Sequence, residues 1–117
     1  MSSLRLRIEG QDINVENGYF AAADKGTPVI ESSSLKLVPG FIDVHNHGAM
    51  GIDVNEADMD GLLKIGAFLA TRGVTAWMPT LVPDSDENYR RVIDAIDELM
   101  VVQEGKRVAQ AVGVHYE

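Results

Sequence analysis

From residue 38 onward, strand-like and helix-like segments alternate, and this order constrains the fold more than any other feature of the sequence. Residues 38–44 form an almost continuous apolar run, which predicts a strand buried on both faces. Further strands are expected at 74–81 and 108–117. Helices are expected at 58–72 and from Asp84 or Ser85 to near Gly105. The order strand, helix, strand, helix, strand is typical of a parallel α/β sheet with right-handed crossovers.

The first 37 residues have a different pattern. Residues 4–9 alternate apolar and charged side chains, as a half-buried strand does. Shorter strands are expected at 13–15, 19–22 and 29–30, with turns at 17–18 and 24–28. The sequence therefore predicts a small antiparallel β unit at 1–37, followed by an α/β unit at 38–117.

Two histidines stand one residue apart where the first strand of the α/β unit ends. Side chains alternate between the two faces of a strand, so His45 and His47 should point the same way and could hold one ion. A lone histidine here would more readily be a surface or core imidazole. The pair, placed after an apolar run and before Gly48, favours a metal site.

His115 and Glu117 stand at the end of the third expected strand. In parallel α/β folds the carboxyl ends of the strands share one face, so all three histidines of the chain are expected there. Glu117 is a third candidate ligand, and its alternative is a solvated tail. For His115, contact with a ligand residue, contact with substrate and simple packing all stay open.

Two further residues could serve the same face. Asp43 shares the parity of the histidines, so it could orient an imidazole or bond to nearby backbone N–H groups. Thr80, at the end of the second strand, could point into the mouth of the site.

Composition limits the chemistry of such a site. The chain has no cysteine, so the ligands must be histidine and carboxylate, which suit zinc, iron, cobalt and manganese. The formal charge of −8 argues against binding nucleic acid or an anionic membrane. No segment approaches the ~18 apolar residues of a membrane span or has the pattern of a signal peptide, so a cytoplasmic location is expected by default.

Three motifs together resemble a known family. They are Pro39-Gly40-Phe41-Ile42-Asp43-Val44-His45-Asn46-His47-Gly48 with Gly51-Ile52-Asp53, then Gly73-Val74-Thr75 with Pro79-Thr80-Leu81-Val82, and finally Gly113-Val114-His115-Tyr116-Glu117. At these residues the chain resembles the amidohydrolase superfamily and, within it, the N-acetylglucosamine-6-phosphate deacetylases.

The resemblance implies a metal-dependent (β/α)₈ barrel, with a small β-sandwich formed in part by residues 1–37. His45 and His47 correspond to the family's first-strand ligands, and Glu117 to its third-strand glutamate. Zinc or iron would be the first choice of metal, and cobalt or manganese the second. The implied substrate is a small amino-sugar phosphate, N-acetylglucosamine 6-phosphate, whose acetamide is hydrolysed by metal-activated water.

The chain also departs from the family, because it has 117 residues whereas a (β/α)₈ barrel typically needs ~250. We therefore expect about three βα units of a partial barrel, with further ligands and the general base beyond residue 117. Such a chain is expected to be a truncated product that is inactive alone. Its third strand would leave an open apolar edge that could drive homo-oligomerisation.

Two alternatives remain at this point. A dihydroorotase, hydantoinase or deaminase would share the two strand-end histidines, but would not be expected to place a ligand glutamate at the third strand. A non-catalytic α/β module that covers its edge by self-association would also explain the short chain.

Overall fold

The computed structural model describes residues 3–22 and 30–117. The chain divides into two compact units, Met1–Pro39 and Gly40–Glu117, where the sequence predicted a division between residues 37 and 38. The turn predicted at 24–28 and the first residue of the strand predicted at 29–30 lie outside the described residues.

The first unit is a four-stranded sheet in the order β3-β2-β1-β4. Its strands are β1 (Ser3–Ile8), β2 (Gln11–Glu16), β3 (Tyr19–Ala21) and β4 (Ile30–Ser32). β1, β2 and β3 pair antiparallel as predicted, but β4 pairs parallel with β1. The prediction of a wholly antiparallel unit is therefore wrong at β4. A tight hairpin enforces antiparallel pairing, whereas the longer connection between β3 and β4 does not.

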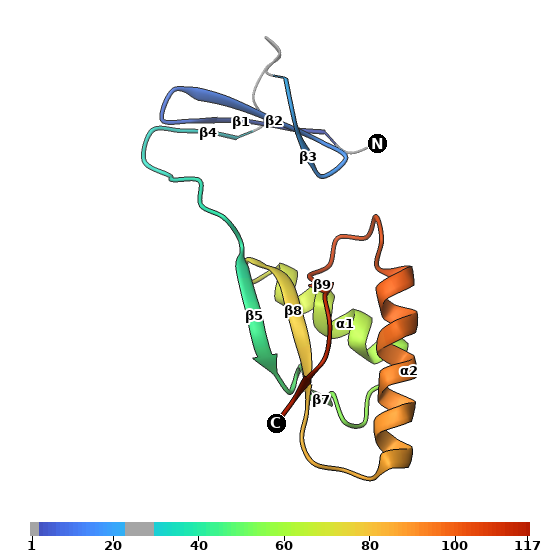
Figure 1. Ribbon diagram of the computed structural model, residues 1–117. Coiled ribbons are helices and arrows are strands. Elements are labelled where there is room, and N and C mark those ends of the chain that lie inside the picture. Colours follow the sequence, from blue (N-terminus) through green and yellow to red (C-terminus); the bar gives the residue numbers. More distant parts are fainter. Residues whose placement is uncertain (1–2, 23–29) are drawn as a thin grey trace. The chain divides into compact units, whose positions relative to one another are not determined.

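The second unit is a mixed α/β structure with two helices (Figure 1), as the alternating pattern predicted. Its elements are β5 (Phe41–Asn46), β6 (Gly48–Ala49), β7 (Ile52–Asp53), α1 (Met59–Ala70), β8 (Val74–Leu81), α2 (Asp86–Val102), β9 (Gln110–Ala111) and β10 (His115–Tyr116). β8 is the central strand: it pairs parallel with β5 on one side and with β9 and β10 on the other. β6 and β7 form a separate two-stranded hairpin.

Both helices begin at side-chain caps. Asp58 accepts a hydrogen bond from the Gly61 N–H at the start of α1, and Ser85 accepts one from the Asn88 N–H at the start of α2. Of the two caps predicted for the second helix, the structure uses Ser85. α1 ends before Gly73, whose φ of +82° is a conformation that favours glycine and stops the helix.

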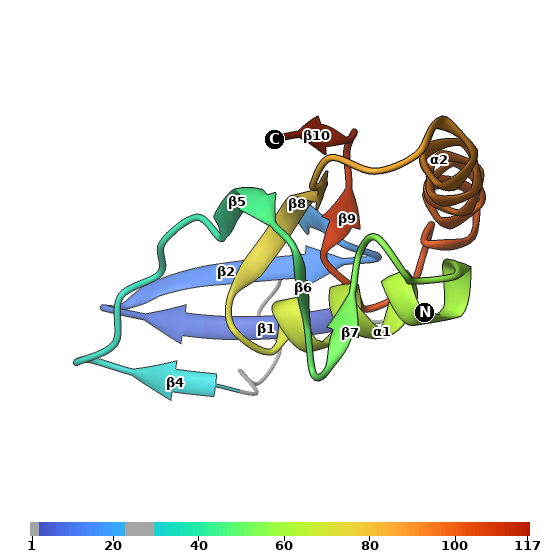
Figure 2. The same cartoon turned by 90° about the horizontal axis from the view of Figure 1, so that it is seen from below.

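The core of this unit lies between β8, β9 and the two helices (Figure 2). Trp77 and Leu81 of β8 are fully buried there. Apolar residues at helical spacing form the core side of both helices, whereas Met100 of α2 is 41% exposed. The buried members are Leu62, Ile65 and Leu69 of α1 and Val92, Ile96 and Leu99 of α2. Within the described residues, neither helix is long and apolar enough to cross a membrane.

The first strand of this unit is not buried on both faces, which corrects the sequence-based prediction. β5 begins at Phe41, and Phe41, Ile42 and Val44 are 68%, 66% and 55% exposed. β5 is the last strand at its end of the sheet, and β8 is its one neighbour among the described residues. Apolar composition alone predicted burial, but burial also requires a second layer over the strand.

The third strand is also different from the prediction, because 108–117 forms two short strands rather than one. β9 and β10 both pair with β8 but are separated by residues 112–114. The interruption lies opposite Met78 and Pro79 of β8. Proline has no N–H to donate to the ladder, so continuous pairing cannot pass this point.

Candidate metal centre

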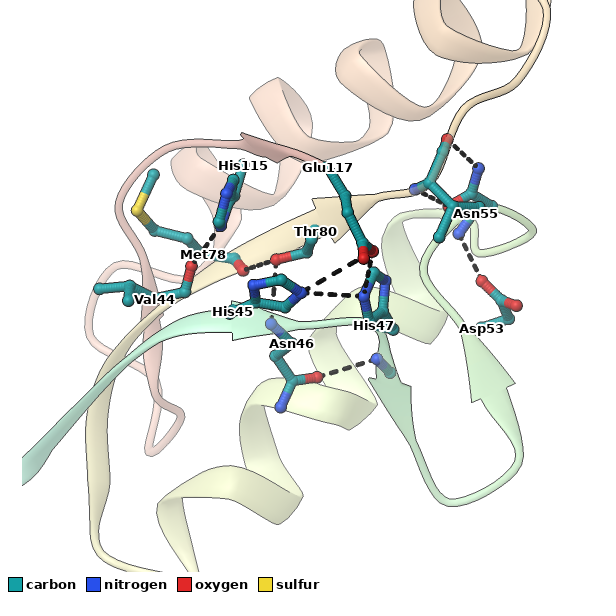
Figure 3. Close-up of polar contacts among 12 residues, drawn as sticks. Val44, His45, Asn46, His47, Asp53, Asn55, Met78, Thr80, His115 and Glu117 are labelled. Carbon is teal, nitrogen blue, oxygen red and sulfur yellow. Dashed lines mark hydrogen bonds and ion pairs between the residues drawn. The ribbon is translucent and has the colours of Figure 1, made fainter.

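His45 and His47 project from the carboxyl end of β5 to the same side, as their spacing predicted (Figure 3). Their Nε2 atoms are 3.0 Å apart, and the two rings meet edge to face with centroids 4.9 Å apart. The two nitrogens therefore converge on a single point rather than lying side by side along the strand.

Glu117 joins the pair from a different strand end, although 70 residues separate it from His47 in sequence. Its backbone N–H donates to the Leu81 carbonyl, which continues the β10–β8 ladder to the last residue. This anchoring places Glu117 Oε2 2.8 Å from His47 Nε2 and 3.8 Å from His45 Nε2. The structure thus brings together the three residues that the sequence singled out as candidate ligands.

The donor set and its spacing suit a small divalent cation. Ligand bonds of ~2.0–2.2 Å at angles between octahedral and tetrahedral place neighbouring donor atoms about 2.8–3.5 Å apart. Two of the three separations here, 2.8 and 3.0 Å, fall in that range, and the third is 3.8 Å. Lone pairs that face one another repel, so a proton or a metal ion must lie among them.

The centre is open to solvent. The side chains of His45, His47 and Glu117 are 47%, 41% and 52% exposed. An ion could therefore reach the three donors without rearrangement of the chain, and a further ligand or substrate could approach it from the same side.

His115 lies beside the centre but points its Nδ1 away from it. That nitrogen is 2.8 Å from the Val44 carbonyl oxygen, and its ring packs edge to face against His45 with centroids 4.8 Å apart. A carbonyl can only accept, so Nδ1 carries the hydrogen. Of the roles left open for His115, contact with a candidate ligand residue is the one that this geometry supports.

Asp43 and Thr80 touch the backbone of β5 rather than its imidazoles. Asp43 accepts from the His45 N–H and from the Asn46 side chain. Thr80 is fully buried, and its hydroxyl accepts from the Asn46 N–H at 2.9 Å and donates to the Met78 carbonyl at 3.1 Å. Thr80 therefore contacts the backbone between the two histidines, and its side chain is buried rather than exposed at the centre.

The chain turns sharply after His47, and Gly48 makes the turn possible. Gly48 has a φ of +138°, and a Cβ atom there would collide with the Ile52 carbonyl oxygen. The turn is closed by a hydrogen bond from the Val54 N–H to the His47 carbonyl. It directs the chain away immediately, which keeps the space beside His47 free.

The sequence reasoning missed two asparagines that hold the loops around the centre. Asn46 accepts from the Gly48 N–H, and Asn55 both donates to the Val82 carbonyl and accepts from its N–H. The position of Asn46 within the two-histidine motif was visible, but its role as an Asx-type turn residue could have been inferred only from local turn chemistry.

Asn55 is part of a polar network with the loop that precedes α2. Arg91 donates to the Asn55 and Ala57 carbonyls, while Asn55 and Asn88 both donate to Asp84. Hydrogen bonds from the Ser85 backbone and from these two asparagines lower the pKa of the Asp84 carboxyl below its ordinary value. The network ties the loop after β7 to the loop after β8, on the side of the unit that carries the centre.

The fold and the donor set define an α/β protein with a candidate metal centre at the carboxyl ends of its parallel strands. The same fold occurs in a solved structure titled N-acetylglucosamine-6-phosphate deacetylase from Pasteurella multocida. The TM-score is 0.80 at 20% sequence identity, over 98% of this chain and 34% of that one. No protein-family model matches the chain.

Sequence comparison leads to the same group of enzymes. The chain is 32% identical over 112 residues to the N-acetylglucosamine-6-phosphate deacetylase of Danio rerio. The match covers 93% of this chain and 27% of that protein. The chain is 33% identical over 76 residues to the N-acetylgalactosamine-6-phosphate deacetylase of Escherichia coli O157:H7, over 64% of this chain and 20% of that protein. The chain is thus similar to N-acetylglucosamine-6-phosphate deacetylases, and it spans 20–27% of the length of these curated relatives.

Proposed function

We propose that this chain contributes part of the active site of a metal-dependent hydrolase that removes the acetyl group from N-acetylglucosamine 6-phosphate. The observation that carries the proposal is the convergence of His45, His47 and Glu117 from two separate strand ends. Similarity to proteins that bear this enzyme's name, over nearly the whole chain, supports it.

The three donors would hold a divalent cation, with zinc or iron as the first choice and cobalt or manganese as the second. Such a cation polarises a carbonyl group and lowers the pKa of a water molecule. The chain's own part is to present two imidazole nitrogens and one carboxylate oxygen at an accessible point, with the rings held by β5 and the carboxylate by the β10–β8 ladder.

Metal binding is tested by titrating the chain with Co²⁺ or Zn²⁺ in a calorimeter. We expect one ion per chain, and we expect His47→Ala and Glu117→Gln each to weaken binding at least tenfold. Glu98→Gln is the matched control, because it removes an exposed carboxylate from α2, away from the centre. Equal affinity in all four proteins would contradict the proposed centre.

We further propose that residues 38–117 are the first part of a (β/α)₈ barrel, and that residues 1–37 are part of a β-sandwich. Three features support the barrel: the parallel pairing of β5, β9 and β10 with β8, the helical crossovers α1 and α2, and the donors at the carboxyl ends of the strands. On this basis the general base would be supplied by other residues than these 117, and the chain alone is expected to release no acetate.

The substrate is tested with a chimera in which residues 40–117 replace the aligned segment of the Pasteurella multocida enzyme. We expect the chimera to release acetate from N-acetylglucosamine 6-phosphate, faster than from the unphosphorylated sugar or from N-acetylgalactosamine 6-phosphate. The same chimera with His47→Ala is the control. Preference for the galactosamine substrate, or hydrolysis of a cyclic amide such as dihydroorotate, would point to a different amidohydrolase.

A second candidate is a module that self-associates through β5. The exposed apolar side chains of Phe41, Ile42 and Val44 on an end strand favour it. Sedimentation of the chain tests it: a dimer is expected, and Ile42→Lys should return it to a monomer. A wild-type chain that sediments as a monomer at micromolar concentration would rule out this candidate.

A further inference from the structure

On both sides of β8, the neighbouring backbone contains one extra residue where it passes the same point of β8. On β5, Asp43 pairs with Trp77 and Asn46 pairs with Pro79. Two residues of β5, Val44 and His45, therefore lie opposite the single residue Met78. On the other side, Ala111 pairs with Trp77 and His115 pairs with Thr80. The three residues 112–114 therefore lie opposite two residues of β8, Met78 and Pro79. The two register shifts flank Met78 and Pro79. The one on β5 includes His45 and ends one residue before His47, and the other ends two residues before Glu117. Bulges re-aim the side chains that follow them.

A bulge leaves backbone groups without their ladder partners, and here side chains take their place. The Asn46 N–H, between the two histidines, donates to the Thr80 hydroxyl. The Val44 carbonyl, directly before His45, accepts from His115 Nδ1. The Thr80 hydroxyl also donates to the Met78 carbonyl, so its position is fixed at both ends, and the residue is fully buried.

We propose that Thr80 is a positioning residue for the metal centre, a role that rests on the function proposed above. The Thr80 hydroxyl fixes the backbone at Asn46, the residue between His45 and His47 in the sequence. Without this bond, the bulge can rotate the peptide planes on both sides of Asn46, and the two Nε2 atoms no longer meet at one point. Loss of an interaction that orients ligands typically costs 10–100-fold in metal affinity.

The chain provides a matched control on the same strand. The Thr75 hydroxyl donates to the Phe41 carbonyl at 3.3 Å, so Thr75 also joins β8 to the backbone of β5. Thr75 lies at the opposite end of the strand pair from the histidines and is exposed. Thr80→Val and Thr75→Val therefore each remove one threonine hydroxyl that bonds to β5, and one of the two is next to the centre.

The experiment is a Co²⁺ titration of the whole chain followed by visible absorption, which reports both affinity and ligand geometry. We expect Thr80→Val to bind Co²⁺ at least tenfold more weakly and with altered d–d bands. Thr80→Ser keeps the hydroxyl, so it should retain the wild-type affinity and spectrum, as should Thr75→Val. Emission from Trp77, the one tryptophan of the chain, shows whether each variant is folded.

Each result decides the proposal. Wild-type affinity in Thr80→Val would overturn it, and equal weakening in Thr80→Ser would overturn it by assigning the effect to the methyl group. If Thr80→Val does not fold, Thr80→Ala is compared with Thr80→Ser by the same criteria. A wild-type chain that binds no Co²⁺ would instead overturn the metal centre itself, so the two failures are distinguishable.

Discussion

The two sides of strand β8 differ in what they do for the protein. Toward the helices, Trp77 and Leu81 are fully buried, and they belong to one apolar core with residues of α1, α2 and β9. Toward β5, neighbouring side chains such as Ile42 remain 66% exposed. The candidate ligands lie at the strand ends, where β5 and β10 flank β8, whereas the apolar core lies against the helices.

The largest expected effect on the free energy of unfolding comes from a cavity in the core beside the helices. We expect Leu62→Ala to lower the free energy of unfolding by about 2–5 kcal/mol, because Leu62 is fully buried. Ile42→Ala, on the exposed side, should change it by less than about 0.5 kcal/mol. Urea unfolding followed by Trp77 emission measures both, and equal losses would show that β5 also carries the stability.

The next effect concerns the other side. If the centre binds an ion in the folded state alone, a metal concentration 100-fold above Kd should stabilise the chain by about 2.7 kcal/mol. The same unfolding experiment with and without Zn²⁺ measures this gain. His47→Ala should lose it while keeping its metal-free stability, and Leu62→Ala should keep it. A gain that survives in His47→Ala would place the ion elsewhere.

Helix caps should give a smaller effect that is confined to the helix side. Ser85→Ala removes the side-chain oxygen that accepts from the Asn88 N–H, and we expect a loss of about 1 kcal/mol. Ser85→Asp retains a capping oxygen and should be close to wild type. Co²⁺ affinity should be unchanged in both variants, and a parallel loss of affinity would show that the two sides are coupled.

The smallest expected effect is a pH dependence at the loop that joins the two sides. Hydrogen bonds from Ser85, Asn55 and Asn88 hold the pKa of Asp84 below its ordinary value, so this group stabilises the folded state at neutral pH. That contribution is lost as the pH falls below 3.8, the ordinary pKa of the carboxyl, and through its lower pKa in the folded state. Asp84→Asn should therefore lose less stability on acidification than wild type does, as measured by urea midpoints between pH 5 and pH 3.

Much of this arrangement could be predicted from the sequence because its signals are local. The helix predicted at 58–72 and the strand predicted at 74–81 both appear in the structure, as α1 and β8. The Ser85 cap of α2 was one of the two that short polar side chains before this helix predicted. The alternation of side chains along β5 was enough to place His45 and His47 on one side.

Other features could not be predicted, because they depend on contacts between distant segments. The parallel pairing of β4, the exposure of Ile42 and Val44 and the division of the third strand all depend on which neighbours a segment has. The apolar run before the histidines indicated a strand, but it did not show whether a second layer covers that strand.

By itself, the sequence determined which residues could bind a metal, since the absence of cysteine and the two-histidine motif limit the ligands to imidazole and carboxylate. The tertiary structure alone decided that Glu117 lies 2.8 Å from His47, and that Thr80 and His115 hold the backbone between and before the histidines. Periodicity fixes the direction of a side chain relative to its own strand. Distances between strands depend on register, and here the register changes opposite Met78 and Pro79, where a proline interrupts the ladder.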